Sequence, residues 1–152
     1  MDQQLNNYFN GNTLAADTWK SKYALRDLDD NVLEDTPDDM HKRMAREFGR
    51  ISEEYGWGHK PYLLSEYGRK RGQMTEKKAY SLFKDFKHII PQGSIMAGLG
   101  DEFRYKSLSN CVVLEDVVDS YGGICYTDQQ LAQLMKRRCG VGVDISNLRP
   151  RG

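Results

Sequence analysis

The sequence predicts a mainly helical fold that ends in one strand–helix–strand unit. Three observations support this prediction. Apolar residues recur at helical spacing between residues 14 and 88, the segment SNCVVLE (109–115) is apolar and β-branched, and VGVD (141–144) follows one helix later. The unit from 109 to 144 has about 36 residues, which is the size of a parallel crossover. Two short strands are marginal as a sheet, so we expect further strands or packing partners from outside this unit.

The clearest helix start lies at TPDD (36–39). Its threonine can cap the helix, its proline fits the first helical position, and its two acids suit the first turn. Apolar side chains then recur at spacings of four, four and three residues, at Met40, Met44, Phe48 and Ile51. We therefore expect a helix with a buried stripe that runs to Tyr55 and ends at Gly56.

Weaker patterns fill the rest of the N-terminal part. Helices are expected at 14–25 and 75–88, and a turn rich in aspartate is expected at 27–31. The segments 57–74 and 89–108 are interpreted as loops, because glycine and proline interrupt both of them.

The C-terminal part is interpreted as a strand, a helix and a second strand. The strand at 109–115 is continuous and apolar, so we expect it to be buried on both faces. A helix is expected to begin at Asp119 or Ser120 and to run to Arg138. Gly140 stands where the C-terminal cap of that helix belongs.

The composition fits one cytoplasmic domain. The chain has 152 residues, 39% of them apolar, and 22 basic residues balance 22 acidic ones. No basic stripe therefore indicates nucleic acid or an anionic membrane, and RKRG (69–72) is interpreted as a solvated patch. No apolar stretch approaches the ~20 residues that span a bilayer, and the first residues do not have the pattern of a signal peptide.

The cysteines do not form a metal-binding pattern. Cys111, Cys125 and Cys139 are each 14 residues from the next, and the three histidines lie in unrelated segments. A structural zinc needs four clustered nitrogen or sulfur ligands, so we expect no metal site. In a reducing compartment these cysteines are expected to be free thiols, or to include one whose partner lies elsewhere.

Three stretches, in this order, carry a resemblance to a known family. They are TWKSKYALRD (18–27) followed by TPDDMHKRMAREFGRI (36–51), IPQGSIMAGLG (90–100) leading into SLSNCVVLE (107–115), and DSYGGI (119–124) with MKRRCGVGVDISNLRPRG (135–152). Together they resemble the opening of the large, catalytic subunit of a class I or class II ribonucleotide reductase. The resemblance covers nearly the whole chain after about residue 12.

This resemblance implies a fold and an activity. The fold is a mainly α N-terminal region, 1–105, followed by the first strand–helix–strand of a ten-stranded α/β barrel, 106–152, which is incomplete alone. The activity is reduction of ribonucleotides to deoxyribonucleotides for DNA synthesis, and it requires the missing remainder of the subunit. In the family, a thiyl radical inside the barrel abstracts the ribose 3′ hydrogen, and two further cysteines supply electrons and become a disulfide. Cys111 matches one of these two, although a strand cysteine is, on residue type alone, more often inert packing.

The resemblance also implies contacts to the substrate. The matching positions line the ribose and phosphates of the nucleotide, and they are Gly93, Ser94, Asn110, Cys139 and Gly140. Small residues suit such contacts, because backbone N–H groups can then approach phosphate oxygens. The sequence departs from the family pattern at two places: PQGSIM (91–96) replaces the commoner P-N-[ST]-P-x-L, and Cys139 replaces a small, unreactive residue. A loop turn and a helix cap are the alternative interpretation of these positions.

A regulatory site is implied as well. Asp119, Ser120 and Arg149 match the specificity site, where a deoxynucleoside triphosphate or ATP selects the base to be reduced. An aspartate there binds the sugar hydroxyl, and an arginine binds the phosphates as a charged fork. A plain helix N-cap is the alternative role of Asp119. The helix 120–138 is expected to pair with its twofold mate in a homodimer, or to face the barrel, through four apolar side chains: Ile124, Leu131, Leu134 and Met135.

Cofactors and partners follow from the same resemblance. The fragment itself is expected to bind no cofactor, because the radical comes from a metal-containing small subunit or from adenosylcobalamin. The expected partners are a second polypeptide with the rest of the barrel, a second copy of the assembled subunit, a radical-generating subunit, and thioredoxin or glutaredoxin. Two alternatives remain: a stand-alone nucleotide-binding or adaptor module without catalysis, and a plain helical interaction domain, which the strand–helix–strand tail disfavours.

Overall fold

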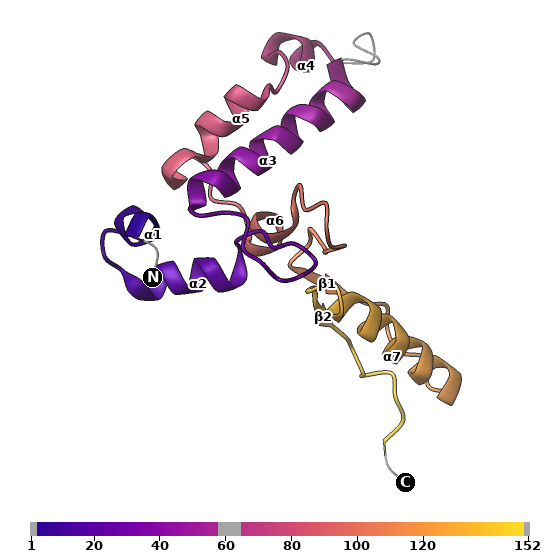
Figure 1. The fold of residues 1–152 in the computed structure, drawn as a ribbon. Helices are drawn as coiled ribbons and strands as arrows, with labels where there is room; N and C mark the ends of the chain where they lie inside the picture. The colour runs from indigo at the N-terminus through magenta and orange to yellow at the C-terminus, as the bar shows by residue number, and fades with distance from the viewer. Residues whose placement is uncertain (1–2, 58–64, 151–152) are drawn as a thin grey trace.

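The computed structural model describes residues 3–57 and 65–150. The elements follow in the order α1 (Gln3–Tyr8), α2 (Thr13–Lys22), α3 (Pro37–Ser52), the π-helical turn η1 (Glu53–Trp57), α4 (Glu66–Arg71), α5 (Glu76–Phe83), the 3-10 turn η3 (Lys84–Phe86), α6 (Gly93–Gly98), β1 (Cys111–Val113), α7 (Tyr121–Met135) and β2 (Gly140–Gly142). Figure 1 shows α3 and α5 side by side, α1 and α2 next to them, and the β1–α7–β2 segment extending away. The prediction of a mainly helical fold with one strand–helix–strand unit is confirmed.

The two strands form the predicted parallel crossover. Cys111 pairs with Gly140, and Val113 pairs with Gly142, on either side of α7. The expectation that β1 is buried on both faces is wrong, because Cys111 is exposed and 79% of Val113 is accessible. Within the described residues the sheet has two strands, and β1 is exposed on the face that carries Cys111 and Val113, whereas Val112 on the other face is partly buried. The apolar character of this strand therefore exceeds what the chain itself buries.

The predicted start of α3 is confirmed. The Thr36 backbone N–H donates to Asp39 Oδ2 over 3.2 Å, and the Thr36 hydroxyl donates to the same oxygen over 3.1 Å. Met40 and Met44 are fully buried, as the stripe predicted, whereas Phe48 is 37% exposed. The predicted end is wrong, because the chain continues from α3 through the π-helical turn η1, which contains Gly56.

Other boundaries also differ from the prediction. The expected loop at 57–74 contains α4, its residues 58–64 lying outside the described part, and the expected loop at 89–108 contains α6. The helix expected to reach residue 88 stops at Phe83, because Asp85 adopts a left-handed conformation with φ 55°. Gly140 is not the cap of α7 but the first residue of β2. The left-handed residue after α7 is Arg138, with φ 66°.

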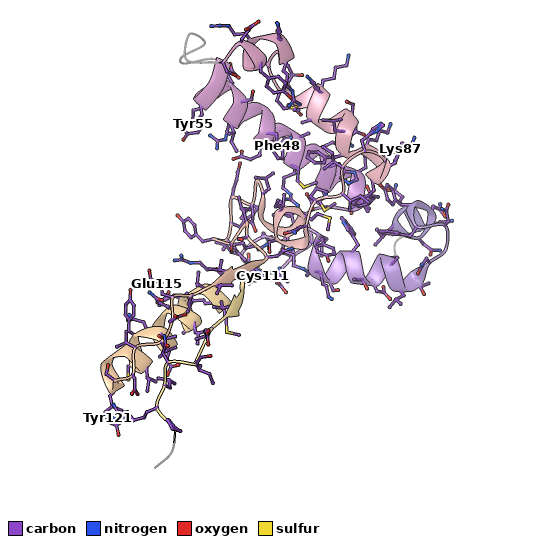
Figure 2. All side chains as sticks on the ribbon, turned by 180° about the vertical axis from the view of Figure 1, so that it is seen from behind. Phe48, Tyr55, Lys87, Cys111, Glu115 and Tyr121 are labelled. Atoms are coloured by element: carbon purple, nitrogen blue, oxygen red, sulfur yellow. The ribbon has the colours of Figure 1, made fainter. Side chains whose placement is uncertain are left out.

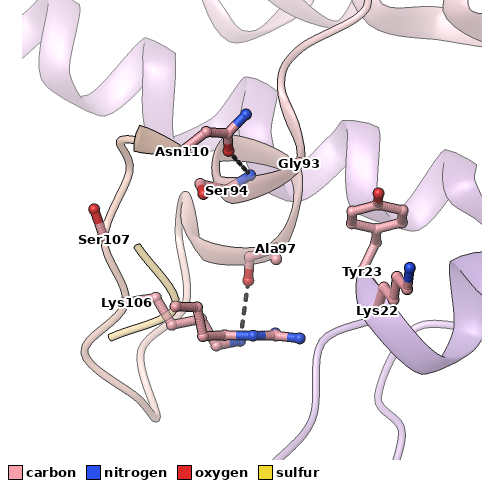
Figure 3. Close-up of a pocket in the computed structure, with 9 residues that line it drawn as sticks. Lys22, Tyr23, Gly93, Ser94, Ala97, Lys106, Ser107 and Asn110 are labelled. Atoms are coloured by element: carbon pink, nitrogen blue, oxygen red, sulfur yellow. Dashed lines mark hydrogen bonds between the residues drawn. The ribbon is translucent and has the colours of Figure 1, made fainter. Parts of the chain in front are cut away.

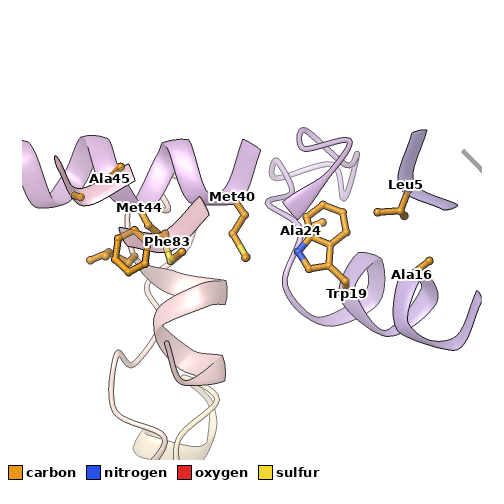
Figure 4. Packing of buried hydrophobic residues seen from close by; sticks show 10 residues of the cluster. Leu5, Ala16, Trp19, Ala24, Met40, Met44, Ala45 and Phe83 are labelled. Atoms are coloured by element: carbon orange, nitrogen blue, oxygen red, sulfur yellow. The ribbon is translucent and has the colours of Figure 1, made fainter. Parts of the chain in front are cut away.

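One hydrophobic cluster joins α1, α2, α3 and α5 (Figure 4). Trp19 of α2 is 3% exposed, and Phe83 of α5 is 4% exposed. The helix α1 is too short and polar to be predicted from its sequence, yet its Leu5 is 1% exposed and belongs to the same cluster. Burial of a leucine of this kind stabilises a fold by roughly 1.5–3 kcal/mol, which accounts for the position of α1.

A buried ion pair connects three segments of the helical part. Arg43 Nε donates to Glu34 Oε1 over 2.7 Å, and both side chains are more than nine-tenths buried. The second carboxylate oxygen of Glu34 accepts the Leu25 backbone N–H at 2.8 Å. Arg43 also donates from Nη2 to the Met96 carbonyl at 2.8 Å, and from Nη1 to the Leu99 carbonyl. Arg43 thus fastens the 25–34 segment and α6 to α3.

His41 is a buried titratable group in the same region. Its side chain has no accessible surface, neither ring nitrogen has a hydrogen-bond partner among residues 3–57 and 65–150, and its ring meets Phe86 edge-on at 4.5 Å. Burial lowers the pKa of His41 below its ordinary value of 6.5, an effect that Asp38 and Asp85 oppose. The folded protein therefore favours the neutral imidazole.

This burial predicts a pH dependence of stability. Below pH 6.5 the unfolded chain binds a proton at His41 more readily than the folded chain does, so the stabilising contribution present above that pH is lost on acidification. We expect the free energy of unfolding to fall between pH 7.5 and pH 5.5 more steeply in the wild type than in His41→Leu. Urea unfolding of both proteins at several pH values measures the difference. If the free energy of unfolding fell equally with pH in both proteins, His41 would not be the cause of the pH dependence.

Candidate functional site

Four sequence segments surround an open hollow at the N-terminal end of α6, which we call the α6 hollow (Figure 3). Its volume is about 260 Å³. It is lined by Lys22, Tyr23, Gly93, Ser94, Ala97, Lys106, Ser107, Asn110 and Arg138. The end of α2, the first turn of α6, the chain before β1 and the chain after α7 therefore meet here. Gly93, Ser94 and Asn110 are three of the residues that the sequence predicted for a substrate site.

Asn110 is the residue that links these segments. Its side-chain oxygen accepts the Ser94 backbone N–H at 2.8 Å, and its backbone carbonyl accepts the Gly140 N–H at 2.7 Å. One residue thus holds the first turn of α6 and the first residue of β2 together. This double role explains why a short helix forms in a segment that sequence patterns indicate as a loop.

Close packing favours glycine at two of the predicted positions. A Cβ on Gly93 would lie 3.2 Å from Cε1 of Tyr23. A Cβ on Gly140 would lie 3.2 Å from the Asn110 carbonyl oxygen and 3.3 Å from Cys111 Sγ. The backbone at both positions is therefore uncovered by any side chain of its own and lies directly against its neighbours.

The three cysteines occupy different environments, and all are free thiols. Cys111 begins β1, is exposed, and has its sulfur beside Gly140 of β2. Cys139 is buried and donates weakly from Sγ to the Gly140 carbonyl at 3.4 Å. Cys125 lies on α7 and is exposed. Cys111 is therefore the cysteine that is both accessible and adjacent to the segments around the α6 hollow.

The residues predicted for an effector site form a second group, at the opposite end of α7. Figure 2 shows Cys111 where the β1–α7–β2 segment joins the rest of the molecule, and Tyr121 at its far end. Arg149 donates from Nε to Asp119 Oδ2 at 2.7 Å and from Nη2 to the Asp119 carbonyl at 3.4 Å. Ser120 is the helix N-cap, because its hydroxyl oxygen accepts the Gly123 N–H at 3.0 Å. The alternative role of Asp119 as the helix cap is therefore wrong.

Gly123 has a packing role that the sequence did not indicate. A Cβ at this position would lie 2.4 Å from the Val118 carbonyl oxygen. The first turn of α7 can fold back on the preceding chain only with glycine there.

No protein-family model matches the chain. No curated protein matches it either.

Within residues 3–57 and 65–150, no group of three or more histidine, cysteine or acidic side chains is placed to hold a metal ion. In the same residues, no helix combines the length and apolarity needed to traverse a lipid bilayer. The geometry of the two groups of residues is therefore the basis for a functional proposal.

Sequence reasoning missed the basic side chains near the α6 hollow. Lys22 and Arg138 lie in the segments that carry the family resemblance and Lys106 directly precedes one of them, but nothing in their local spacing marked them as a group. Lys106 is largely engaged, because its Nζ donates to the Ala97 carbonyl at 3.0 Å and lies 2.6 Å from Asp101 Oδ2. Lys22 and Arg138 are the cations that this arrangement leaves available to a negatively charged ligand.

Proposed function

We propose that this chain provides the N-terminal part of the catalytic subunit of a ribonucleotide reductase. One observation carries the proposal. The residues that resemble substrate-contacting positions of that family lie in three separate segments, and these segments converge through Asn110. Chance placement of Gly93–Ser94, Asn110–Cys111 and Cys139–Gly140 would not be expected to bring the three together.

In this proposal Cys111 is one of the two reducing thiols. Two thiols together give up two electrons and two protons, form a disulfide, and are regenerated by thioredoxin or glutaredoxin. The exposure of Cys111 supports this role, because a partner thiol and a substrate both need access to its sulfur. The second thiol and the radical cysteine would belong to the remainder of the subunit.

The α6 hollow would receive part of the nucleotide. The backbone at Gly93, which lines this hollow, can approach a ribose or a phosphate closely, since glycine carries no side chain. Lys22 and Arg138 would add positive charge on the phosphate side. Residues 1–105 would then form the helical domain, and residues 106–152 the opening of the barrel.

The uncovered surface of the strand unit supports a missing partner. Val113, Val118 and Ile145 are all more than 60% exposed, and Thr127 is the residue of α7 that is buried. Val118 and Ile145 flank the strands, and apolar side chains exposed on this scale in and beside a sheet are unusual for a sheet that is complete. A polypeptide with the rest of the barrel would cover it.

Reconstitution tests the proposed function. We expect the purified chain to reduce no ribonucleotide with any radical source, and activity to appear with a polypeptide that contains the remaining barrel cysteines. Candidate partners come from mass spectrometry of complexes purified from the native cell. Turnover by the chain alone would contradict the proposal. Nucleotide binding that persists while every such partner fails to restore turnover would favour the stand-alone binding module instead.

Removing either member of the Asp119–Arg149 pair is expected to change which substrate the assembled enzyme prefers. In the assembled enzyme, Asp119→Ala and Arg149→Ala are each expected to weaken effector binding by about tenfold, because each removes one charge-assisted contact. The choice among the four substrates should change more than the maximal rate, since both residues are remote from the α6 hollow. The measurement is substrate preference at several effector concentrations.

Thr75→Ala is the matched control for that experiment. It removes the N-cap of α5, worth about 1 kcal/mol, without removing a charge or altering a residue of the specificity site. It should lower thermal stability and leave the preference among substrates nearly unchanged. An unaltered effector response in both charge variants would mean that Asp119 and Arg149 form an ordinary surface ion pair.

A further inference from the structure

A second hollow adjoins the α6 hollow and is lined by positive charge. It has a volume of about 510 Å³, and six basic side chains line it: Lys22, Arg26, Arg104, Lys106, Lys136 and Arg138. Among the described residues that line it, Asp30 alone carries a carboxylate. The whole chain has 22 basic and 22 acidic residues, so this concentration of one sign is local. We call it the cationic hollow.

Half of these basic side chains are held by the protein itself. Arg26 donates from Nη1 to the Asp30 carbonyl at 2.8 Å, and Arg104 Nη2 lies 3.2 Å from Asp30 Oδ1. Lys106 is paired with Asp101. These contacts fix the wall of the hollow and reduce its net charge, but they do not neutralise it.

The other three cations have no such partner. In the described ranges 3–57 and 65–150, Lys22, Lys136 and Arg138 form no ion pair. They come from the end of α2 and the end of α7, which are far apart in sequence. Like charges gathered from distant segments repel one another, and a bound anion would remove this cost.

The walls are positioned by backbone contacts. The Ser107 N–H donates to the Arg137 carbonyl at 2.9 Å, which joins the chain before β1 to the end of α7. The backbone of Arg138 then takes a left-handed conformation, with φ 66°, that residues other than glycine rarely adopt. This residue lines both hollows. The bend at Arg138 thus directs a free guanidinium to the place where the two hollows meet.

An aromatic ring lies among the cations. Tyr105 lines the cationic hollow and is 95% exposed, so it contributes almost nothing to the core. Exposed aromatic rings beside basic side chains are typical of sites that stack a nucleobase while cations bind the phosphates. An acidic peptide would use the positive charge but not the ring.

We propose that the cationic hollow binds a nucleoside polyphosphate. Lys22, Lys136 and Arg138 bind the phosphates, and Tyr105 stacks on the base. This site is separate from the Asp119–Arg149 group at the other end of α7. It shares Lys22 and Arg138 with the α6 hollow, but Tyr105 and Lys136 line the cationic hollow and not the α6 hollow, so variants of these two residues distinguish it from the proposed substrate site.

Titration of the full chain at low ionic strength tests the site, with ATP, inorganic tripolyphosphate and an oligoglutamate of equal charge as probes. Calorimetry gives each affinity. Lys22→Gln and Lys136→Gln are each expected to weaken ATP and tripolyphosphate about tenfold. Tyr105→Ala should weaken ATP several-fold and leave tripolyphosphate unchanged. Lys70→Gln is the control, because Lys70 is an exposed lysine on α4 paired with Glu66.

Three results would overturn the proposal. Equal effects of Lys70→Gln and Lys136→Gln would show that binding reflects overall charge. Oligoglutamate binding as tight as ATP would indicate a docking surface for an acidic peptide. Loss of ATP binding in Asn110→Ala together with no effect of Lys136→Gln would place the nucleotide in the α6 hollow. Failure of reconstituted ribonucleotide reduction, by contrast, would leave all three readings of this titration unchanged.

Discussion

Under the proposed function, replacing Cys111 with serine is expected to abolish steady-state ribonucleotide reduction by the reconstituted complex while nucleotide binding stays intact. Serine is nearly isosteric with cysteine, and the exposed position beside Gly140 accommodates either side chain. A serine hydroxyl cannot form a disulfide, so the two reducing electrons cannot be delivered. Multiple-turnover assays with thioredoxin measure the loss, and substrate titration measures the retained binding.

Cys125→Ser is the matched control for this substitution. Cys125 is also an exposed free thiol, but it lies on α7 and does not line the α6 hollow. Its replacement should leave turnover close to that of the wild type. If Cys125→Ser eliminated activity and Cys111→Ser did not, the assignment of the reducing thiol would be reversed.

Replacing Arg43 with alanine is expected to lower the free energy of unfolding by about 3–5 kcal/mol, because it leaves the carboxylate of Glu34 buried without its partner. The carbonyls of Met96 and Leu99 lose a donor in the same step. The loss is a large fraction of the 5–15 kcal/mol that stabilises a typical domain. Urea or guanidinium unfolding followed by circular dichroism measures it.

Two further variants separate burial from charge. Arg50→Ala removes an arginine from the same helix, but Arg50 is exposed and its pairs with Glu47 and Glu54 are on the surface, so the loss should be much smaller. The double substitution Glu34→Met with Arg43→Met should recover part of the stability, because no unpaired charge remains in the core. Equal losses in Arg43→Ala and Arg50→Ala would contradict a structural role for the buried pair.

The elements that the sequence predicted well are those whose signals are local. The start of α3 is encoded by four consecutive residues whose hydrogen bonds close on one another, from Thr36 to Asp39. The start of α7 is similar, since the Ser120 hydroxyl caps the helix by accepting the N–H of Gly123, three residues later. The parallel crossover was predictable from length, because a strand, a helix and a strand of this size have few other arrangements.

The elements that the sequence missed depend on distant residues. The helix α6 is fastened to the chain by Asn110, sixteen positions beyond Ser94, and α1 is held by burial of Leu5 in a cluster from other helices. Gly140 was assigned as a cap because glycine usually supplies the left-handed residue, but Arg138 supplies it instead. No local pattern distinguishes these cases.

The residues of the candidate site also fall into those that the sequence indicated and those that it did not. Gly93, Asn110 and Cys111 were grouped through a family resemblance, and their adjacency could not have been obtained from spacing alone. The cations Lys22, Lys136 and Arg138 were not grouped at all, because they converge only when α2 and the end of α7 come together. Charge clusters of this kind become visible only in three dimensions.

The uncovered strand pair has a consequence for handling the protein in solution. The outer edges of β1 and β2 have no neighbouring strand within the described residues, and apolar side chains accompany them. Open edges can pair with the edges of other molecules, so purified chains at high concentration are expected to associate and to scatter light over time. Storage at low concentration would slow this, because association of two molecules depends on the square of their concentration. Use soon after purification would limit this association further.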